Sequence, residues 1–298
     1  MNGELSYEAR ARGALGREDF RFSHRLGQNF ILDDAVVDEI AARSGAEKGD
    51  VVLEIGPGAG TLTAALRRRG AYVLAVEVDT DLKPVLTSLL GGDEGVRLRF
   101  GDILKCDLNE LRAEMLAMGG GGGRLLVAAN LPYYITSDVL TRFARSGARF
   151  DALTVMVQQE AAERMMARRG SKQYCLLSAL LGWEYALEEV MRLPRTLFTP
   201  APHVDSALVR LEPHAQPPAE VRERDMLLRT LSAAFLMRRK TMLNNLCAAF
   251  SLSREEAAAA LDEAGLATNV RGEALDYAQL AALANALSAR RGDIGTTV

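Results

Sequence analysis

The motif Asn130-Leu131-Pro132-Tyr133 carries groups that suit chemistry on the amine of an adenine ring. Such an amine is a poor nucleophile, because its lone pair is delocalised into the ring. The side-chain carbonyl of Asn130 and the backbone carbonyl of Leu131 or Pro132 can accept hydrogen bonds from the two N–H groups of the amine. These hydrogen bonds draw the nitrogen lone pair out of the ring system. Pro132 stiffens the loop, and Tyr133 offers a flat face on which a flipped-out base can stack.

The alternative interpretation of this motif is structural, with an asparagine and a proline that only shape a turn after a strand. A second aromatic residue, Phe198, lies in a proline-containing stretch at 195–209. Pro200 and Pro202 predict a rigid, extended loop there. Phe198 could form the opposite wall of a base pocket, or it could be a core aromatic residue beneath the loop.

The segment EIGPGAG follows one predicted strand and precedes a predicted helix. Its residues Glu54, Gly56, Gly58 and Gly60 have the spacing E-x-G-x-G-x-G. Glycines in such a turn allow positive φ angles and let a ligand approach the backbone. A turn without a ligand is the alternative. The dinucleotide pattern G-x-G-x-x-G is not met, because Thr61 stands at its last position, and this disfavours a dehydrogenase.

Carboxylates end the next two predicted strands. Glu77 stands about twenty residues beyond the glycine loop, where an acid can accept hydrogen bonds from two ribose hydroxyls. Asp102 follows the third strand, where it could accept a hydrogen bond from an adenine amino group. The plainer alternatives are a strand-end carboxylate for Glu77 and a helix N-cap for Asp102. Because ligands of open α/β sheets bind at the carboxyl ends of the strands, the glycine loop and both acids predict a site for one adenosine-shaped ligand.

Short β-rich runs alternate with amphipathic stretches through the first two-thirds of the chain. This alternation predicts an α/β fold with a parallel, doubly wound sheet. Two late strands, 185–193 and 206–212, have no full helix between them and predict an antiparallel hairpin at one sheet edge. Buried strands are expected at 51–55, 73–77, 96–100, 125–130 and 152–158, and helices at 60–70, 80–90 and 136–145.

A proline-rich break at 213–218 divides the chain. We expect residues 1–20, which lack sustained periodicity, to be a mobile segment, 21–212 to be the α/β domain, and 213–298 to be a small all-helical domain. Ser253 begins a capping box at one helix start in that domain. Its helices are expected at 222–237, 240–250, 254–264 and 275–290.

The composition excludes several classes of protein. The 298 residues are 48% hydrophobic and 25% charged, which excludes a disordered or collagen-like chain. The three cysteines and three histidines are scattered, so neither a disulfide framework nor a metal site is expected. No apolar run approaches the ~18 residues of a membrane helix, and the N-terminus does not resemble a secretory signal. We therefore expect a cytoplasmic protein that uses no metal.

The net charge of −3 argues against a nucleic-acid binder unless cations gather on one face. Two runs of basic residues are candidates for such a face, and Arg21 and Arg25, which flank His24, are a third. Each run could equally be a solvated helix face. The first run is Arg164, Arg168, Arg169 and Lys172, and the second is Arg238, Arg239 and Lys240.

Taken together, the motifs resemble those of the small-subunit ribosomal RNA adenine dimethyltransferase A family, within the ribosomal RNA adenine N6-methyltransferase superfamily. The resemblance covers roughly 24–250, most of the chain. It rests on HRLGQNFILD, VLEIGPGAGTLT, AVEVD, GDIL, NLPYYITSDVL, VQQEAAERM, TLFTPAPHVDSA and FLMRRKTMLNNL, which occur in this order.

The resemblance implies a Rossmann-like class I methyltransferase domain with a seven-stranded, mostly parallel sheet, followed by a helical domain. It implies methyl transfer from S-adenosylmethionine, with S-adenosylhomocysteine as product, to N6 of two adjacent adenosines in a hairpin loop near the 3′ end of 16S RNA. The implied partner is the small ribosomal subunit, whose assembly the enzyme serves, with no membrane and with the protein monomeric when free. The donor-binding positions carried over by motif are Asn29, Ile31, Gly56, Glu77, Asp102 and Asn130.

One position departs from the family, which commonly has leucine where this chain has Ile31, and the contact there is expected through the backbone. Two other interpretations stay open beside an RNA N6-adenine dimethyltransferase. One keeps the same chemistry but acts on large-subunit RNA or DNA. The other is an assembly factor that acts mainly by binding, against which the intact Glu77, Asp102 and Asn130 argue.

Overall fold

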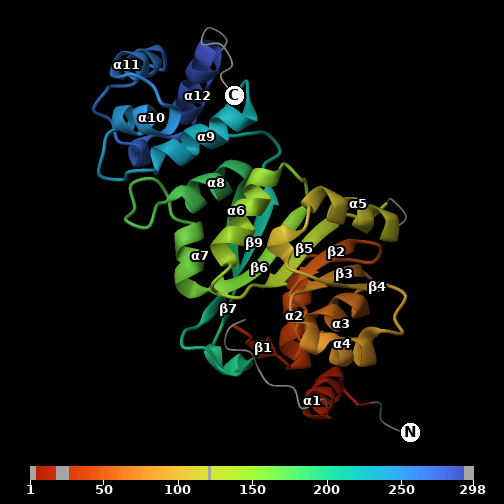
Figure 1. Ribbon diagram of the computed structural model, residues 1–298. Coiled ribbons are helices and arrows are strands. Elements are labelled where there is room, and N and C mark those ends of the chain that lie inside the picture. The colour runs from red at the N-terminus through yellow and green to blue at the C-terminus, as the bar shows by residue number, and fades with distance from the viewer. Residues whose placement is uncertain (1–4, 18–26, 120–121, 292–298) are drawn as a thin grey trace. The chain divides into compact units, whose positions relative to one another are not determined.

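The computed structural model divides into two compact units. It describes residues 5–17, 27–119 and 122–291. Unit 1 comprises Met1–Ala162 and Leu187–Pro213 and holds the sheet, whereas unit 2 comprises Glu163–Ala186 and His214–Val298 and is predominantly helical (Figure 1). The end of unit 1 at Pro213 lies at the predicted proline-rich break. Residues 163–186, which the sequence pattern groups with the α/β domain, pack instead with the C-terminal helices.

The sheet of unit 1 has the strand order β4-β3-β2-β5-β6-β9-β7. The first five strands of this order, β4, β3, β2, β5 and β6, are parallel to one another, and β9 runs antiparallel to β6. The two late strands lie side by side at one edge, as expected, and the predicted α/β class is confirmed. The strands are β2 (Val51–Ile55), β3 (Tyr72–Glu77), β4 (Val96–Phe100), β5 (Leu125–Asn130), β6 (Ala152–Gln158), β7 (Tyr185–Leu193) and β9 (Ser206–Pro213).

Helices cover both faces of this sheet. Val52, Val73 and Ala75 point to the face where α2 and α3 pack, in one buried apolar cluster. Because successive strand residues point to opposite faces, the buried Val51 and Leu53 lie on the other face, where α5 packs against β2 and β5. The helices of unit 1 include α2 (Asp34–Arg43), α3 (Thr61–Arg68), α4 (Lys83–Leu90), α5 (Leu108–Met118) and α6 (Thr136–Ser146).

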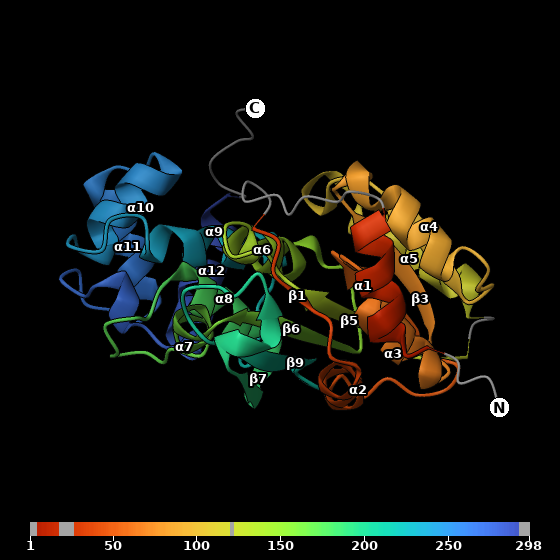
Figure 2. The same cartoon turned by 90° about the horizontal axis from the view of Figure 1, so that it is seen from below.

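A further helix, α1 (Tyr7–Arg17), lies in the N-terminal segment and packs on α3 and α4 (Figure 2). No sustained periodicity is apparent there in the sequence, yet the buried residues Tyr7, Ala11, Ala14 and Leu15 share one helical face at positions i, i+4, i+7 and i+8. Two of the four are alanines, which carry little hydrophobic signal. The Tyr7 hydroxyl donates a hydrogen bond to the Ala59 carbonyl in the glycine loop, at 3.3 Å.

Two short strands form a separate antiparallel pair in unit 1. In β1 (Phe30–Ile31) and β8 (Phe198–Thr199), Phe30 faces Thr199 and Ile31 faces Phe198. This pair fixes the chain directly after residues 27–29, which line the pocket described below. It therefore anchors the N-terminal wall of that pocket to the proline-containing stretch at 195–209.

Unit 2 holds the four helices expected from the sequence after the proline-rich break. The predicted capping box is present: the Ser253 hydroxyl accepts from the Glu256 N–H at 3.1 Å, and the Ser253 N–H donates to the Glu256 carboxylate at 2.7 Å. Among the described residues, no helix is long and apolar enough to cross a membrane. The helices are α7 (Gln159–Met165), which begins in unit 1, α8 (Leu176–Glu184), α9 (Arg224–Ala234), α10 (Met242–Phe250), α11 (Arg254–Glu263) and α12 (Tyr277–Arg291), with a 3-10 turn η5 (Gly272–Ala274).

Candidate active site

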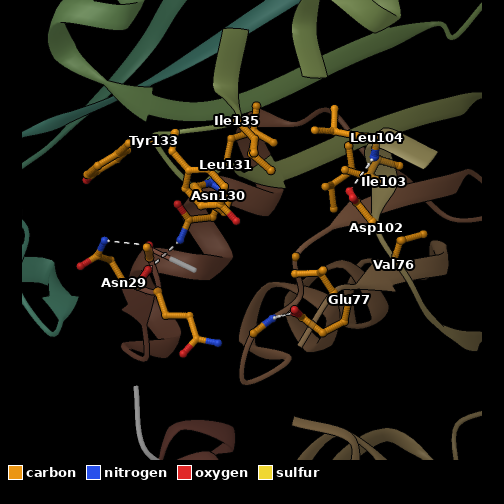
Figure 3. Close-up of a pocket in the computed structure, with 18 of the residues that line it drawn as sticks. Asn29, Val76, Glu77, Asp102, Ile103, Leu104, Asn130, Leu131, Tyr133 and Ile135 are labelled. Atoms are coloured by element: carbon orange, nitrogen blue, oxygen red, sulfur yellow. Dashed lines mark hydrogen bonds between the residues drawn. The ribbon is translucent and has the colours of Figure 1, made fainter. Parts of the chain in front are cut away.

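A pocket of about 210 Å³ opens at the carboxyl ends of β2, β3, β4 and β5 (Figure 3). Its volume is far beyond the ~10–15 Å³ that one water molecule needs, so it can admit an organic ligand. Glu77 and Asp102 lie on one side of it, and Asn29, Asn130 and Tyr133 lie on the other. The parallel register explains this meeting, because the strands bring the ends of four separate sequence motifs to one sheet edge.

Glu77 closes β3, and its carboxylate is held by two backbone amides. The Gly58 N–H donates to Oε2 at 3.1 Å, and the Asp79 N–H donates to Oε1 at 2.9 Å. The side chain is only 5% exposed, and burial raises the pKa of Glu77 above its ordinary value. Each oxygen keeps a further lone pair, so the carboxylate can accept two hydroxyl groups from a ligand in the pocket.

The glycine loop between β2 and α3 has positive φ angles, and neighbouring side chains press on it. A Cβ at Gly58 (φ 57°) would lie 2.9 Å from the Phe30 ring, and one at Gly60 (φ 75°) would lie 2.6 Å from the Tyr7 hydroxyl. Side chains are therefore excluded at both positions for steric reasons as well as for backbone strain. The loop backbone stays bare toward the pocket, where Gly56 and Gly58 form part of the wall.

Asp102 lies between β4 and the short 3-10 turn η3 (Ile103–Lys105). Its Oδ1 accepts the Leu104 N–H at 3.0 Å, so the side chain does cap the turn. The second oxygen, Oδ2, lies 4.0 Å from the Lys105 ammonium. Capping uses one oxygen only, and Asp102 still lines the pocket. The structural interpretation and the ligand-binding interpretation of this residue are therefore compatible.

Asn130 ends β5, and its amide is fixed by one contact. Nδ2 donates to the Asn29 carbonyl at 2.8 Å. Because a carbonyl oxygen can only accept, this contact establishes which end of the amide is the nitrogen. The amide oxygen is therefore the end that remains to accept a hydrogen bond from a ligand. Asn29 itself donates from its side chain to the Gly27 carbonyl at 3.1 Å.

Two tyrosines follow Asn130 along the chain. Tyr133 is half-buried, its hydroxyl lies 3.4 Å from the Ser206 hydroxyl, and burial raises its pKa, so the ring stays neutral at physiological pH. Tyr134 lines the pocket too, and 57% of its surface is exposed. Both rings are thus available at the pocket wall or mouth, which suits the stacking of a flat base.

Three of the residues predicted for the donor and base sites do not line this pocket. Ile31 and Glu54 line a neighbouring cavity of about 40 Å³ beneath the glycine loop, which Asn130 also lines. Phe198 is 4% exposed and belongs to the apolar core cluster that also contains Ile31 and Met156. Its buried position matches the alternative that the sequence left open, a core aromatic residue under the loop. A role as the second wall of a base pocket requires that the ring or β8 move.

Several lining residues were not singled out in the sequence. Most are direct neighbours of motif residues, and the apolar ones stand where strands end, so their place at the sheet edge was the available signal. Together they add apolar walls for a ring system and one amide. They include Gln28, Val76, Val78, Ile103, Leu104 and Tyr134.

Glu54 is buried beneath the glycine loop, and its Oε2 accepts the Thr63 hydroxyl at 2.6 Å. Burial raises the pKa of Glu54 to about 8, and the nearby Glu77 adds to the rise. A carboxyl whose folded pKa is raised favours folding below its ordinary pKa of ~4.3, and that contribution is lost as pH rises toward the folded value. The pH window is therefore about 4.5 to 8.

Replacing Glu54 by glutamine is expected to leave Tm unchanged at pH 5 and to raise it by ~3 °C or more at pH 9. The glutamine carbonyl can still accept the Thr63 hydroxyl, whereas the charge that is unfavourable at high pH is gone. Scanning calorimetry at both pH values tests this. An equal change of Tm at pH 5 and pH 9 would mean that ionisation of Glu54 is not the cause.

The predicted RNA-binding cations lie on the surface of unit 2. Arg238 joins the two runs, because its guanidinium donates to the Lys172 carbonyl at 3.3 Å. Arg238 also pairs with Glu273 at 3.2 Å, and Arg169 donates to the Ala274 carbonyl at 3.0 Å. The structure therefore brings both runs together around η5. The third cluster, Arg21, His24 and Arg25, lies outside the described residues.

The net charge is distributed unevenly between the two units. Unit 2 contains 14 basic and 12 acidic residues, a net charge of +2. Unit 1 contains 22 basic and 27 acidic residues, a net charge of −5. The negative net charge of the chain is therefore carried by unit 1, and the basic runs lie in the unit whose net charge is positive.

The sheet order, the glycine loop and the strand-end acid together define a class I, Rossmann-like methyltransferase fold. The chain belongs to the ribosomal RNA adenine dimethylase family, whose model matches residues 19–289. It is therefore a methyltransferase, and the resemblance inferred from its motifs is confirmed.

Curated relatives cover almost the whole chain. Ribosomal RNA small subunit methyltransferase A of Geobacillus thermodenitrificans is 37% identical over 290 residues, 96% of this chain and 98% of the relative. The protein of the same description from Clostridium perfringens is 38% identical over 269 residues, 90% of this chain and 92% of the relative.

Solved structures share the fold. A dimethyladenosine transferase from Plasmodium falciparum has a TM-score of 0.65 at 22% identity, with 84% of this chain and 94% of that chain covered. The 23S rRNA methyltransferase ErmE has a TM-score of 0.59 at 24% identity, with 87% of this chain and all of that chain covered.

Proposed function

We propose that this chain transfers methyl groups from S-adenosylmethionine to N6 of two adjacent adenosines near the 3′ end of 16S rRNA, in the small ribosomal subunit. The observation that supports this proposal most directly is the orientation of the Asn130 amide. Its nitrogen donates a hydrogen bond to the Asn29 carbonyl, so its oxygen remains to accept from an amine. Family membership and the small-subunit relatives support the RNA target. Such a substrate places the enzyme in the cytoplasm with the ribosome.

The pocket fits the adenosine part of the donor. Gly56 and Gly58 present backbone without side chains to the pocket, and Glu77 offers one oxygen to each ribose hydroxyl. Asp102, with the apolar side chains of Ile103 and its neighbours, suits an adenine ring and its amino group. When bound, S-adenosylmethionine supplies a methyl group on a sulfonium, which is an excellent leaving group.

The residues of the chain then have three tasks: to hold the amine, to hold the ring and to exclude water. The Asn130 oxygen and a backbone carbonyl of the same loop accept hydrogen bonds from the two N–H groups of the amine. They thereby orient the nitrogen lone pair toward the methyl group. Tyr133 stacks on the base. No strong general base is required, because the nitrogen becomes acidic only as it is alkylated and then releases its proton through these acceptors to water.

Unit 2 supplies cations for the RNA backbone. Arg239, Lys240, Arg164, Arg168 and Lys172 are exposed, and Arg238 and Arg169 hold their loops together. Phosphate contacts of this kind give affinity and orientation without sequence information. This arrangement supports RNA binding despite the negative net charge of the chain.

Replacing Arg239 and Lys240 by alanine together is expected to raise the KM for RNA ~10-fold or more and to leave the donor Kd unchanged. The dependence of RNA affinity on salt should also become shallower, by about one unit of slope per lost phosphate contact. Steady-state methyl transfer at varied RNA concentration measures the KM, and a filter-binding titration at several salt concentrations measures the salt dependence of RNA affinity. The matched control replaces Arg12 and Lys48, two exposed cations of unit 1, and should change neither value.

The function is tested with purified protein, labelled S-adenosylmethionine and small subunits that lack the modification, with large subunits and DNA in parallel. Digestion of the RNA should release N6,N6-dimethyladenosine from small subunits only. Label in large subunits or DNA would keep the adenine chemistry and overturn the target. No label in any substrate, with donor binding intact, would favour an assembly factor that acts by binding.

A further inference from the structure

The segment 27–30, which we call the strap, is hydrogen-bonded to both sides of the pocket. On one side, the Asn29 carbonyl accepts the Asn130 amide at 2.8 Å. On the other, the Gln28 Nε2 donates to the Asp79 Oδ2 at 2.5 Å, across 51 positions of the sequence. All four strap residues line the pocket. The strap therefore connects the loop that holds the amine to the end of β3.

Asp79 is well placed to anchor the strap. It is 8% exposed, and its Oδ1 is occupied by the Asp81 N–H at 3.1 Å, so Oδ2 is directed to Gln28. Its own N–H donates to the Glu77 carboxylate at 2.9 Å. A bond from an amide to a carboxylate with little access to water is among the stronger hydrogen bonds in proteins. Gln28, Asp79 and Glu77 thus form one continuous chain.

We propose that Gln28 and Asp79 are positioning residues, whose hydrogen bond latches the strap over the pocket and couples donor binding at Glu77 to the orientation of the Asn130 amide. This inference rests on the proposed methyl transfer. Without the latch, the strap loses its tie to the end of β3 and keeps its anchor in β1, so the Asn29 carbonyl can shift and the Asn130 oxygen is less well pre-oriented toward the amine. Preorganised polar groups of this kind account for much of the rate enhancement in enzymes.

The chemistry of the pair allows a reversal of donor and acceptor. Gln28→Glu places two carboxylates within hydrogen-bond distance, so they repel at high pH and share a proton at lower pH. In Asp79→Asn, the introduced amide nitrogen faces Gln28, which can turn its own amide and accept. In the double variant, the carboxylate introduced at position 28 accepts from the amide introduced at position 79. The charge-assisted bond is thereby restored with its direction reversed.

The test measures donor Kd by calorimetry and kcat by methyl release at pH 8 and pH 6. At pH 8, Gln28→Glu should raise the donor Kd ~10-fold and lower kcat by a similar factor, whereas the double variant and Asp79→Asn should stay within ~3-fold of the parent. At pH 6, the shared proton should recover much of the loss in Gln28→Glu. A purely structural role would instead lower Tm in Gln28→Glu while the donor Kd and kcat of the folded protein stay unchanged.

A matched control is provided by Gln159, whose amide donates to the Glu189 carboxylate at 3.2 Å in unit 1 and outside the pocket lining. Gln159→Glu makes the same chemical change and should leave donor Kd and kcat unchanged. If Gln28→Glu lowers Tm strongly, Gln28→Ala removes the latch without adding charge and should still lower kcat and weaken donor binding.

Two outcomes would overturn the latch while the proposed function stands. In the first, the parent protein is active, and both Gln28→Glu and Gln28→Ala have the same donor Kd and kcat as the parent. The other is a folded double variant that remains as impaired as Gln28→Glu. A parent protein that transfers no methyl group to any substrate would instead refute the proposed function.

Discussion

Replacing Asn130 by alanine is expected to lower kcat by ~10²- to 10³-fold, the loss typical of removing one preorganised polar group from an active site. The donor Kd should change by less than ~3-fold. The reason is geometric: the amide nitrogen is engaged by Asn29, and in the proposed arrangement the oxygen that remains accepts from the substrate amine. Single-turnover methyl transfer and donor calorimetry separate the two quantities.

Asn130→Asp is the informative companion variant. It keeps an acceptor for the amine but replaces the Nδ2 donor by an oxygen that faces the Asn29 carbonyl. Two acceptors then meet, so the side chain should turn away and kcat should fall almost as far as in the alanine variant. Equal losses of kcat and donor affinity in Asn130→Ala would mean that Asn130 serves the donor alone.

The sheet was predictable because buried parallel strands have a strong pattern. Runs such as Val51–Ile55 and Leu125–Asn130 are apolar, rich in β-branched or small residues and bounded by helical stretches, and the strands have the expected bounds. Helix α1 was not predicted, because its buried face depends on two alanines. The grouping of 163–186 with the C-terminal helices is set by tertiary packing, and no break in the sequence marks it.

The candidate site was predictable where a motif ends a strand. Glu77, Asp102 and Asn130 meet because parallel strands present their carboxyl ends at one edge. The partners that orient these residues were not predictable, because they come from distant parts of the chain. Only the folded chain brings Gln28 within hydrogen-bond distance of Asp79 and the Asn29 carbonyl within hydrogen-bond distance of Asn130. The two basic runs likewise meet only in the folded unit 2.

Replacing Glu77 by alanine is expected to raise the donor Kd by ~10- to 100-fold, since both ribose hydrogen bonds are lost at ~0.7–1.4 kcal/mol each. At saturating donor, kcat should fall much less, because Glu77 does not contact the amine in the proposed arrangement. Calorimetry with S-adenosylmethionine and with S-adenosylhomocysteine measures the affinity. An unchanged affinity for both would remove Glu77 from the donor site.

The alanine variant also leaves the N–H groups of Gly58 and Asp79 without their acceptor, so a loss of loop order must be told apart from a loss of ribose contacts. The pH dependence does so. Burial raises the pKa of Glu77, and protonation removes acceptor capacity, so the donor affinity of the unaltered protein should weaken as pH falls through that raised pKa. In Glu77→Gln, which keeps the size but cannot ionise, the affinity should be lower and nearly independent of pH. A similar weakening at low pH in Glu77→Gln would place the titrating group elsewhere.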